Sequence, residues 1–111
     1  MFKKIISSFR TRKILRKAIS LTYPFSATHK VAARDHNGYA VPPNDPSARS
    51  FCAIGYIERA THLCGYDLYP YAENTVARVT IKNNIDGFLG TYFDTMQGTA
   101  EDARKMFEKA L

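Results

Sequence analysis

The apolar positions near the N-terminus recur at the spacing of an α-helix. A first set comprises Phe2, Ile5, Ile6 and Phe9, and a second set, offset from the first, comprises Ile14, Leu15, Ala18 and Ile19. Ser7, Ser8 and Thr11 are weak helix formers, so the pattern predicts a break near residues 10 to 12. Two short helices or one bent helix fit this pattern, and Pro24 ends the second segment.

A turn or small hairpin is predicted between residues 30 and 41, where Asn37-Gly38 separates two short segments. Asn and Gly tolerate the positive φ that tight hairpin turns require. Pro42-Pro43 follows and blocks further ladder hydrogen bonds. Any sheet in this part of the chain is therefore expected to be small.

The clearest helix signal is Asp45-Pro46, because Asp can cap a helix and Pro fits its first turn. We expect a central helix over residues 46–64, ended by Gly65 in the left-handed conformation. Gly55 is predicted to form a notch for close backbone packing, and a ligand gap is the alternative. The apolar stripe of this helix is Ala48, Phe51, Cys52, Tyr56, Ala60 and Leu63.

Two more elements are predicted in the C-terminal part of the chain. A short helix is expected over residues 73–83, followed by an irregular segment marked by glycines at positions 87, 90 and 98. Thr99 with Glu101 and Asp102 resembles a capping box that opens a last helix. The fold class is thus mainly α with a small β-hairpin or turn, a compact bundle of about four helices around the helix 46–64.

Composition supports one folded domain, because 111 residues with a hydrophobic fraction of 45% can build a single core. The net charge of +6 is concentrated at the N-terminus. Residues 18–111 carry nine basic and ten acidic residues, whereas residues 1–17 carry seven basic residues and no acid. We therefore divide the chain into a basic amphipathic arm, residues 1–13, and a single helical domain, residues 14–111. The seven basic residues are Lys3, Lys4, Arg10, Arg12, Lys13, Arg16 and Lys17.

This basic stretch is the leading candidate binding surface. Lys and Arg interleaved with apolar residues suit nucleic-acid phosphates, an acidic host protein or, less favoured, an anionic membrane surface. A plainer interpretation is a helix whose apolar side packs on the domain while its charges are solvated. Homo-oligomerisation stays open.

The sequence carries no motif of a familiar enzyme or metal site. Phosphate loops, dinucleotide fingerprints and nucleophile elbows are absent, so we expect no catalytic residue and no cofactor, and enzymatic activity is disfavoured. Cys52, His62 and Cys64 lack metal-ligand spacing. Without a signal-peptide core or an apolar run of roughly 20 residues, the expected location is the cytoplasm.

Six residues form a further candidate surface for a ligand or partner. An oligomeric protein that sequesters a nucleotide-like ligand is the alternative function, with aromatic rings stacking on the ligand and Arg34 or Arg59 meeting its phosphate. Arg59 pairs with Asp94 if the glycine-rich segment folds over the central helix. An enzyme using Asp35, His36 or Asp94 ranks last. The six are Arg34, Asp35, His36, Arg59, Tyr92 and Asp94.

Several short motifs between residues 15 and 111 resemble those of a known family. They are Ala33-Arg34-Asp35 with Gly38, Pro42-Pro43-Asn44-Asp45-Pro46 with Ala48, Phe51-Cys52-Ala53-Ile54-Gly55 with Arg59-Ala60, and Phe93-Asp94 before Thr99. The family comprises short bacterial and bacteriophage proteins of unknown function. The resemblance implies a compact helical domain, with Asp35, Asp45 and Asp94 at turns and caps, but no reaction. With the basic arm, it leads us to expect a non-enzymatic accessory or anti-defence factor of a phage or mobile element, in the bacterial or host cytoplasm.

Overall fold

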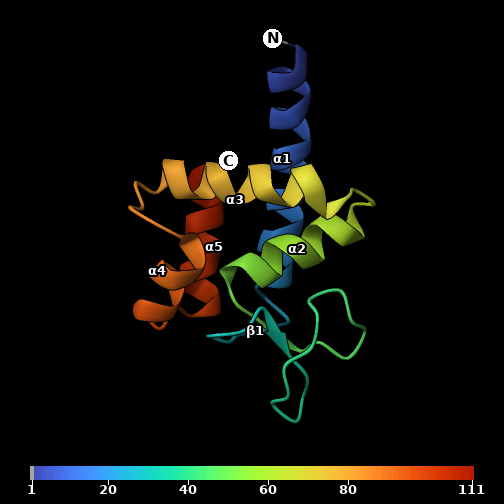
Figure 1. Ribbon diagram of the computed structural model, residues 1–111, viewed down its shortest axis with the longest axis vertical. Coiled ribbons are helices and arrows are strands. Elements are labelled where there is room, and N and C mark those ends of the chain that lie inside the picture. Colours follow the sequence, from blue (N-terminus) through green and yellow to red (C-terminus); the bar gives the residue numbers. More distant parts are fainter. Residues whose placement is uncertain (1) are drawn as a thin grey trace.

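The computed structural model describes the backbone of residues 2–111 and the side chains of residues 8–111. Within them it contains five α-helices and a small three-stranded sheet, which confirms the mainly α fold class (Figure 1). The elements, in chain order, are α1 Phe2–Leu21, β1 Ser26–Ala27, β2 Ala33–Arg34, β3 Ser50–Phe51, α2 Ala53–Leu63, the irregular helical turn η1 Leu68–Ala72, α3 Glu73–Lys82, α4 Leu89–Thr95 and α5 Ala100–Ala110.

Helix α1 is one continuous helix, so the predicted break near residues 10 to 12 is wrong. Ile14, Leu15 and Ala18 are completely buried where α1 packs on α2 and α5. Thr11 is buried as well, on the same side of the helix. Tertiary packing therefore outweighs the weak helix propensity of the local sequence. The N-terminal part of α1 extends beyond α3, outside the body of the domain (Figure 1).

The predicted helix 46–64 is wrong in its first part. The Asp45 carboxylate accepts hydrogen bonds from the backbone N and the Oγ of Ser47, at 2.8 and 2.7 Å, and closes a local turn instead of capping α2. Strand β3 follows as the middle strand of the sheet, parallel to β1 and antiparallel to β2. Helix α2 begins after Cys52, whose Sγ accepts a hydrogen bond from the backbone N of Gly55.

Gly55 is a packing notch, as predicted. A Cβ at this position would overlap the carbonyl oxygen of Ala32, and that oxygen also accepts a hydrogen bond from Cys52 N at 3.0 Å. The first turn of α2 therefore packs directly on the backbone that leads into β2. At the other end of α2, Gly65 has φ +77° and terminates the helix as expected.

The turn before the double proline is also confirmed. Gly38 has φ +86°, and Arg34 forms an antiparallel bridge with Ala40. The Asp35 carboxylate accepts hydrogen bonds from the backbone N of Asn37 and of Tyr39. Asp35 therefore stabilises the turn itself.

The C-terminal elements match the sequence in two of three cases. The short helix α3 and the last helix α5 lie where expected, and Thr99 and Asp102 form the capping box. The segment predicted to be irregular instead contains the helix α4. Gly90 lies inside α4, close to the side chain of Ile54, so here glycine permits close packing of two helices.

One aromatic cluster forms the centre of the core. The Tyr56 ring lies 5.3 Å from that of Phe51 and 6.2 Å from that of Phe107, measured between centroids, and all three are fully buried. The Tyr56 hydroxyl donates to the carbonyl oxygen of Phe25 at 2.6 Å. Burial raises the pKa of this hydroxyl, so it stays protonated and keeps the hydrogen bond. Side chains from residue 14 to residue 110 pack in this single core.

The Gly55 contact leads to a first prediction. Gly55→Ala should destabilise the protein by about 3 kcal/mol, because the new methyl group meets backbone that cannot rotate away. Gly65→Ala is the matched control: it has open space around it and should lose only about 1 kcal/mol from its positive φ. Urea denaturation of both variants measures the difference, and equal losses would contradict the close packing.

Candidate functional site

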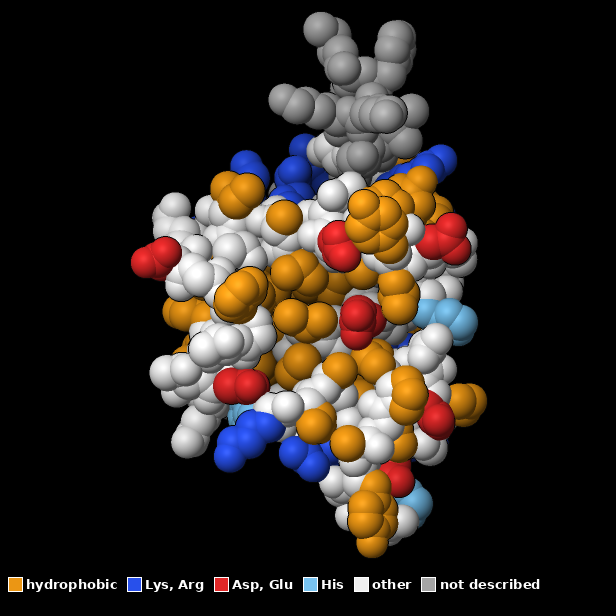
Figure 2. Space-filling view, viewed as in Figure 1, with side chains coloured by type: hydrophobic (Ala, Val, Ile, Leu, Met, Phe, Trp, Pro, Cys, Tyr) orange, Lys and Arg blue, Asp and Glu red, His pale blue; other side chains and the backbone are white. Residues whose placement is uncertain are grey.

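Three cationic side chains of α1 line one side of a shallow hollow on the surface. Lys13, Arg16 and Lys17 lie at i, i+3 and i+4 on one side of the helix and are all exposed. With Ser20, Leu63 and Cys64 they line a hollow of about 450 Å³, which we call the basic hollow. Among residues 8–111, no acidic side chain lines it. Figure 2 shows several Lys and Arg side chains at one end of the body of the domain.

The other cations of α1 with described side chains are engaged within the protein. The Arg10 guanidinium donates to the Tyr71 hydroxyl and lies 5.3 and 5.7 Å from the ring centroids of Tyr71 and Tyr66. Arg12 Nε donates to the carbonyl oxygen of Leu111 at 3.1 Å. These two arginines therefore hold α1 against the segment 66–71 and the end of α5. The predicted binding residues Lys3 and Lys4 lie outside the described side chains.

Cys64 lines the basic hollow, and its thiol lies close enough to Lys13 and Lys17 for their charges to affect its pKa. Burial raises the pKa of Cys64, and the neighbouring Lys13 and Lys17 lower it in part. Cys52, at the start of α2, is more deeply buried, and desolvation raises its pKa too. Both thiols are therefore protonated at neutral pH and fit structural roles.

The second predicted surface is not brought together as one site. The Arg34 guanidinium donates to Thr28 Oγ1 and to the carbonyl oxygens of His29 and Gly38, so it supports its own loop. Asp35 is used by its turn, and His36 is exposed beside it.

The conditional ion pair between Arg59 and Asp94 is not formed among residues 8–111. Arg59 Nη1 donates to the carbonyl oxygens of Pro43 and Asp45, at 3.1 and 2.9 Å. Asp94 instead accepts a hydrogen bond from the backbone N of Lys30 at 3.1 Å. The sequence identified polar residues that hold loops but paired them incorrectly.

Tyr92, the last residue of that group, lies on α4. It lines a small surface hollow with Asp86, Gly87, Phe88, Thr91 and Thr95, and none of the predicted arginines lines that hollow. Within residues 8–111, no group of three or more His, Cys, Asp or Glu side chains is placed to hold a metal ion.

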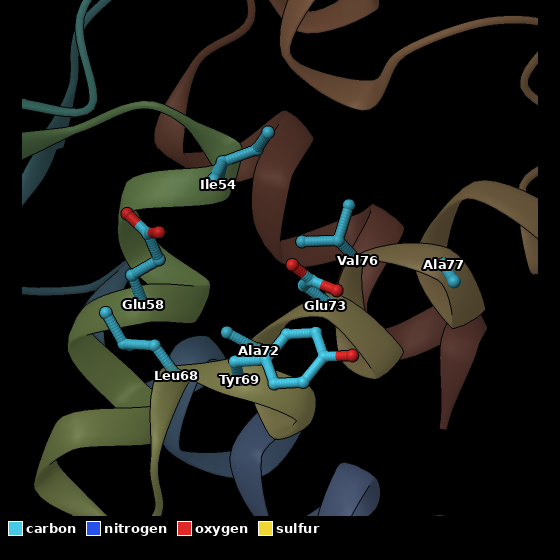
Figure 3. Close-up of a pocket in the computed structure, with 8 residues that line it drawn as sticks. All are labelled: Ile54, Glu58, Leu68, Tyr69, Ala72, Glu73, Val76 and Ala77. Carbon is cyan, nitrogen blue, oxygen red and sulfur yellow. The ribbon is translucent and has the colours of Figure 1, made fainter.

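Sequence reasoning missed a pocket between α2, η1 and α3. It has a volume of about 380 Å³ and is mainly apolar, with two carboxylates, those of Glu58 and Glu73 (Figure 3). Its lining residues are Ile54, Glu58, Leu68, Tyr69, Ala72, Glu73, Val76 and Ala77. The available signal was Ile54 and Glu58 at i and i+4 on α2, but their partners come from another element. Burial among these apolar side chains raises the pKa of Glu58.

Comparison of this chain with family models, curated proteins and solved structures finds no match. The resemblance to the bacterial and phage family therefore stays a prediction. None of the described helices combines the length and apolar character needed to cross a bilayer.

The free energies of unfolding of two variants test which cations of α1 have a structural role. Arg10→Ala should lower the free energy of unfolding by about 1 kcal/mol, because it removes a hydrogen bond and two cation–π contacts. Arg16→Ala removes the same charge from the same helix and should change it by less than about 0.5 kcal/mol. Urea denaturation checks this, and equal effects would show that Arg10 has no structural role.

Glu58 gives a pH-dependent prediction. Because its pKa is raised in the folded state, the native protein holds this proton more tightly than the unfolded chain does, and stability falls as pH rises through that range. Glu58→Gln should therefore raise the melting temperature at pH 7, and the gain should disappear below about pH 4. The exposed Glu108→Gln is the control. A gain that persists unchanged at low pH would argue against burial as its cause.

Proposed function

We propose that this protein binds nucleic acid through the basic hollow of α1, by contacts to the phosphate backbone. One observation carries the proposal: Lys13, Arg16 and Lys17 are exposed around one concave surface. Within residues 8–111 they form no ion pair, since the single ion pair there joins Lys105 and Glu101. Cations without an ion-pair partner can neutralise the charge of an external anion.

The arrangement of the charges favours a polymer over a single small anion. The three cations follow one helix over little more than a turn, and the hollow between them is shallow and open to solvent. Such a row can meet successive phosphates, whereas a small anion is usually held by donors that surround it. Binding of this kind depends strongly on salt and little on sequence.

Neighbouring side chains supply apolar contacts beside the charges. Leu63 is 47% exposed at the edge of the hollow, and Lys13 Nζ lies 5.6 Å from the centroid of the Tyr66 ring. Apolar and aromatic groups next to cations are typical of surfaces that accept single-stranded nucleic acid. Residues 18–111 carry nine basic and ten acidic residues, so this part of the chain is close to electrically neutral and does not oppose the approach of a polyanion.

The test is the salt dependence of binding to labelled DNA, measured by fluorescence anisotropy with a duplex and with a single strand. For the triple variant Lys13→Gln, Arg16→Gln and Lys17→Gln, affinity should fall, and the slope of log Kobs against log salt should decrease by about 1 for each cation removed. The variant keeps the buried side of α1, so circular dichroism should show an unchanged fold.

The matched control removes three exposed lysines from other elements: Lys30→Gln, Lys82→Gln and Lys105→Gln. It changes the net charge by the same amount and should leave most of the affinity and slope intact. Equal losses of affinity and slope in both triple variants would show that binding depends only on net charge. That result would overturn the assignment of the basic hollow as the binding surface.

An anionic membrane is the second candidate partner, favoured by Phe9, which is 67% exposed on α1 near the cations. Flotation with vesicles of phosphatidylcholine and phosphatidylglycerol distinguishes a membrane partner from nucleic acid. Vesicle binding that Phe9→Ser abolishes, without any binding to DNA, would replace the nucleic-acid proposal.

A further inference from the structure

The pocket between α2, η1 and α3, which we call the acidic pocket, combines negative charge with an apolar wall. The carboxylates of Glu58 and Glu73 lie on different sides of it, one on α2 and one at the start of α3 (Figure 3). Ile54, Ala72 and Val76 line the space between them. In Figure 2, hydrophobic side chains fill the middle of the face where α2 and α3 lie, with acidic side chains among them.

Neither carboxylate has a cationic partner within residues 8–111. No Lys, Arg or His side chain lines the acidic pocket, and no ion pair involves Glu58 or Glu73. Glu58 is partly buried among apolar groups, where an unpaired carboxylate is costly. An incoming cation would supply the charge that this surrounding lacks.

An aromatic ring adds a second feature that attracts cations. Tyr69 is 73% exposed, and its ring runs along one side of the pocket toward Glu73 (Figure 3). An ammonium group is attracted both by carboxylates and by the face of an aromatic ring. The apolar wall requires that the rest of the ligand be hydrophobic.

The dimensions fit a small molecule. The volume of about 380 Å³ lies within the range of small-molecule sites, and three elements bound the space. We infer that the acidic pocket binds a small organic cation, an alkyl- or arylammonium compound whose charged end meets one of the two carboxylates, Glu58 or Glu73, and whose apolar body packs on Ile54 and Val76. The pocket shares no residue with the basic hollow, so this inference does not depend on nucleic-acid binding.

Phenethylammonium is a suitable probe, titrated into the full chain and followed by backbone amide NMR shifts. The shifts should map to α2, η1 and α3, with residues 54, 69 and 76 among the most affected. Phenethyl alcohol and hydrocinnamate keep the apolar body but are neutral and anionic, and each should bind at least about tenfold more weakly. Equal binding of the alcohol would overturn the role of charge.

The double variant Glu58→Gln and Glu73→Gln keeps the shape of the pocket and removes its charge. It should raise the Kd of phenethylammonium by about tenfold or more. The control, Glu101→Gln with Glu108→Gln, removes two exposed carboxylates from α5 and should leave the Kd unchanged. Thermal melts of both variants confirm folding. An unchanged Kd in the pocket variant, or shifts that map elsewhere, would overturn the inference.

Sedimentation velocity tests for the other occupant, a second copy of this chain whose basic N-terminal segment lies in the acidic pocket. A monomer at every concentration supports the small-molecule assignment. A dimer that dissociates in the Glu58→Gln and Glu73→Gln variant would overturn it.

Discussion

The structure depends on the close approach of two backbones, that of α2 at Gly55 and that of the segment before β2 at Ala32. Only a residue without a side chain leaves room for the Ala32 carbonyl oxygen, which at the same time accepts the hydrogen bond from Cys52 N. This contact fixes where α2 begins and how β3 enters the sheet. The direction of α2 then decides both surfaces of interest, because Ile54 and Glu58 line the acidic pocket while Leu63, near its other end, borders the basic hollow.

Helix α1 combines a structural side and an exposed side over the same turns. Ile14, Leu15 and Ala18 pack in the core, and Arg10 and Arg12 contact segments far away in the sequence. At the positions between these, the cations of the basic hollow face solvent. The predicted boundary between arm and domain at residue 13 lies inside this one continuous helix.

The sequence was most informative where structure is set by neighbours along the chain. The Thr99 capping box, the positive φ of Gly65 and the Asp35 turn each involve a few consecutive residues, and all three are confirmed. The errors arise where distant segments decide. Asp45-Pro46 suits a helix start as well as a turn, and the pairing of β3 with strands β1 and β2 selects the turn.

The candidate sites divide in the same way. The run of basic residues is visible in the sequence, yet which cations are free and which are engaged follows only from the positions of Tyr71 and Leu111. The acidic pocket could not be predicted, because Glu58 and Glu73 belong to different helices and their relative position depends on the irregular turn η1 between them. Local rules do not specify the course of such a turn.

The arrangement of α1 has a consequence for how such a protein can change over evolutionary time. Substitutions on the buried side of the helix disturb the core, whereas exchanges among Lys13, Arg16 and Lys17 touch little else in the domain. The exposed residues of α1 can therefore be substituted with little effect on the fold. The charge of this surface can in this way vary by a few exchanges on α1 while α2 and the aromatic core stay as they are.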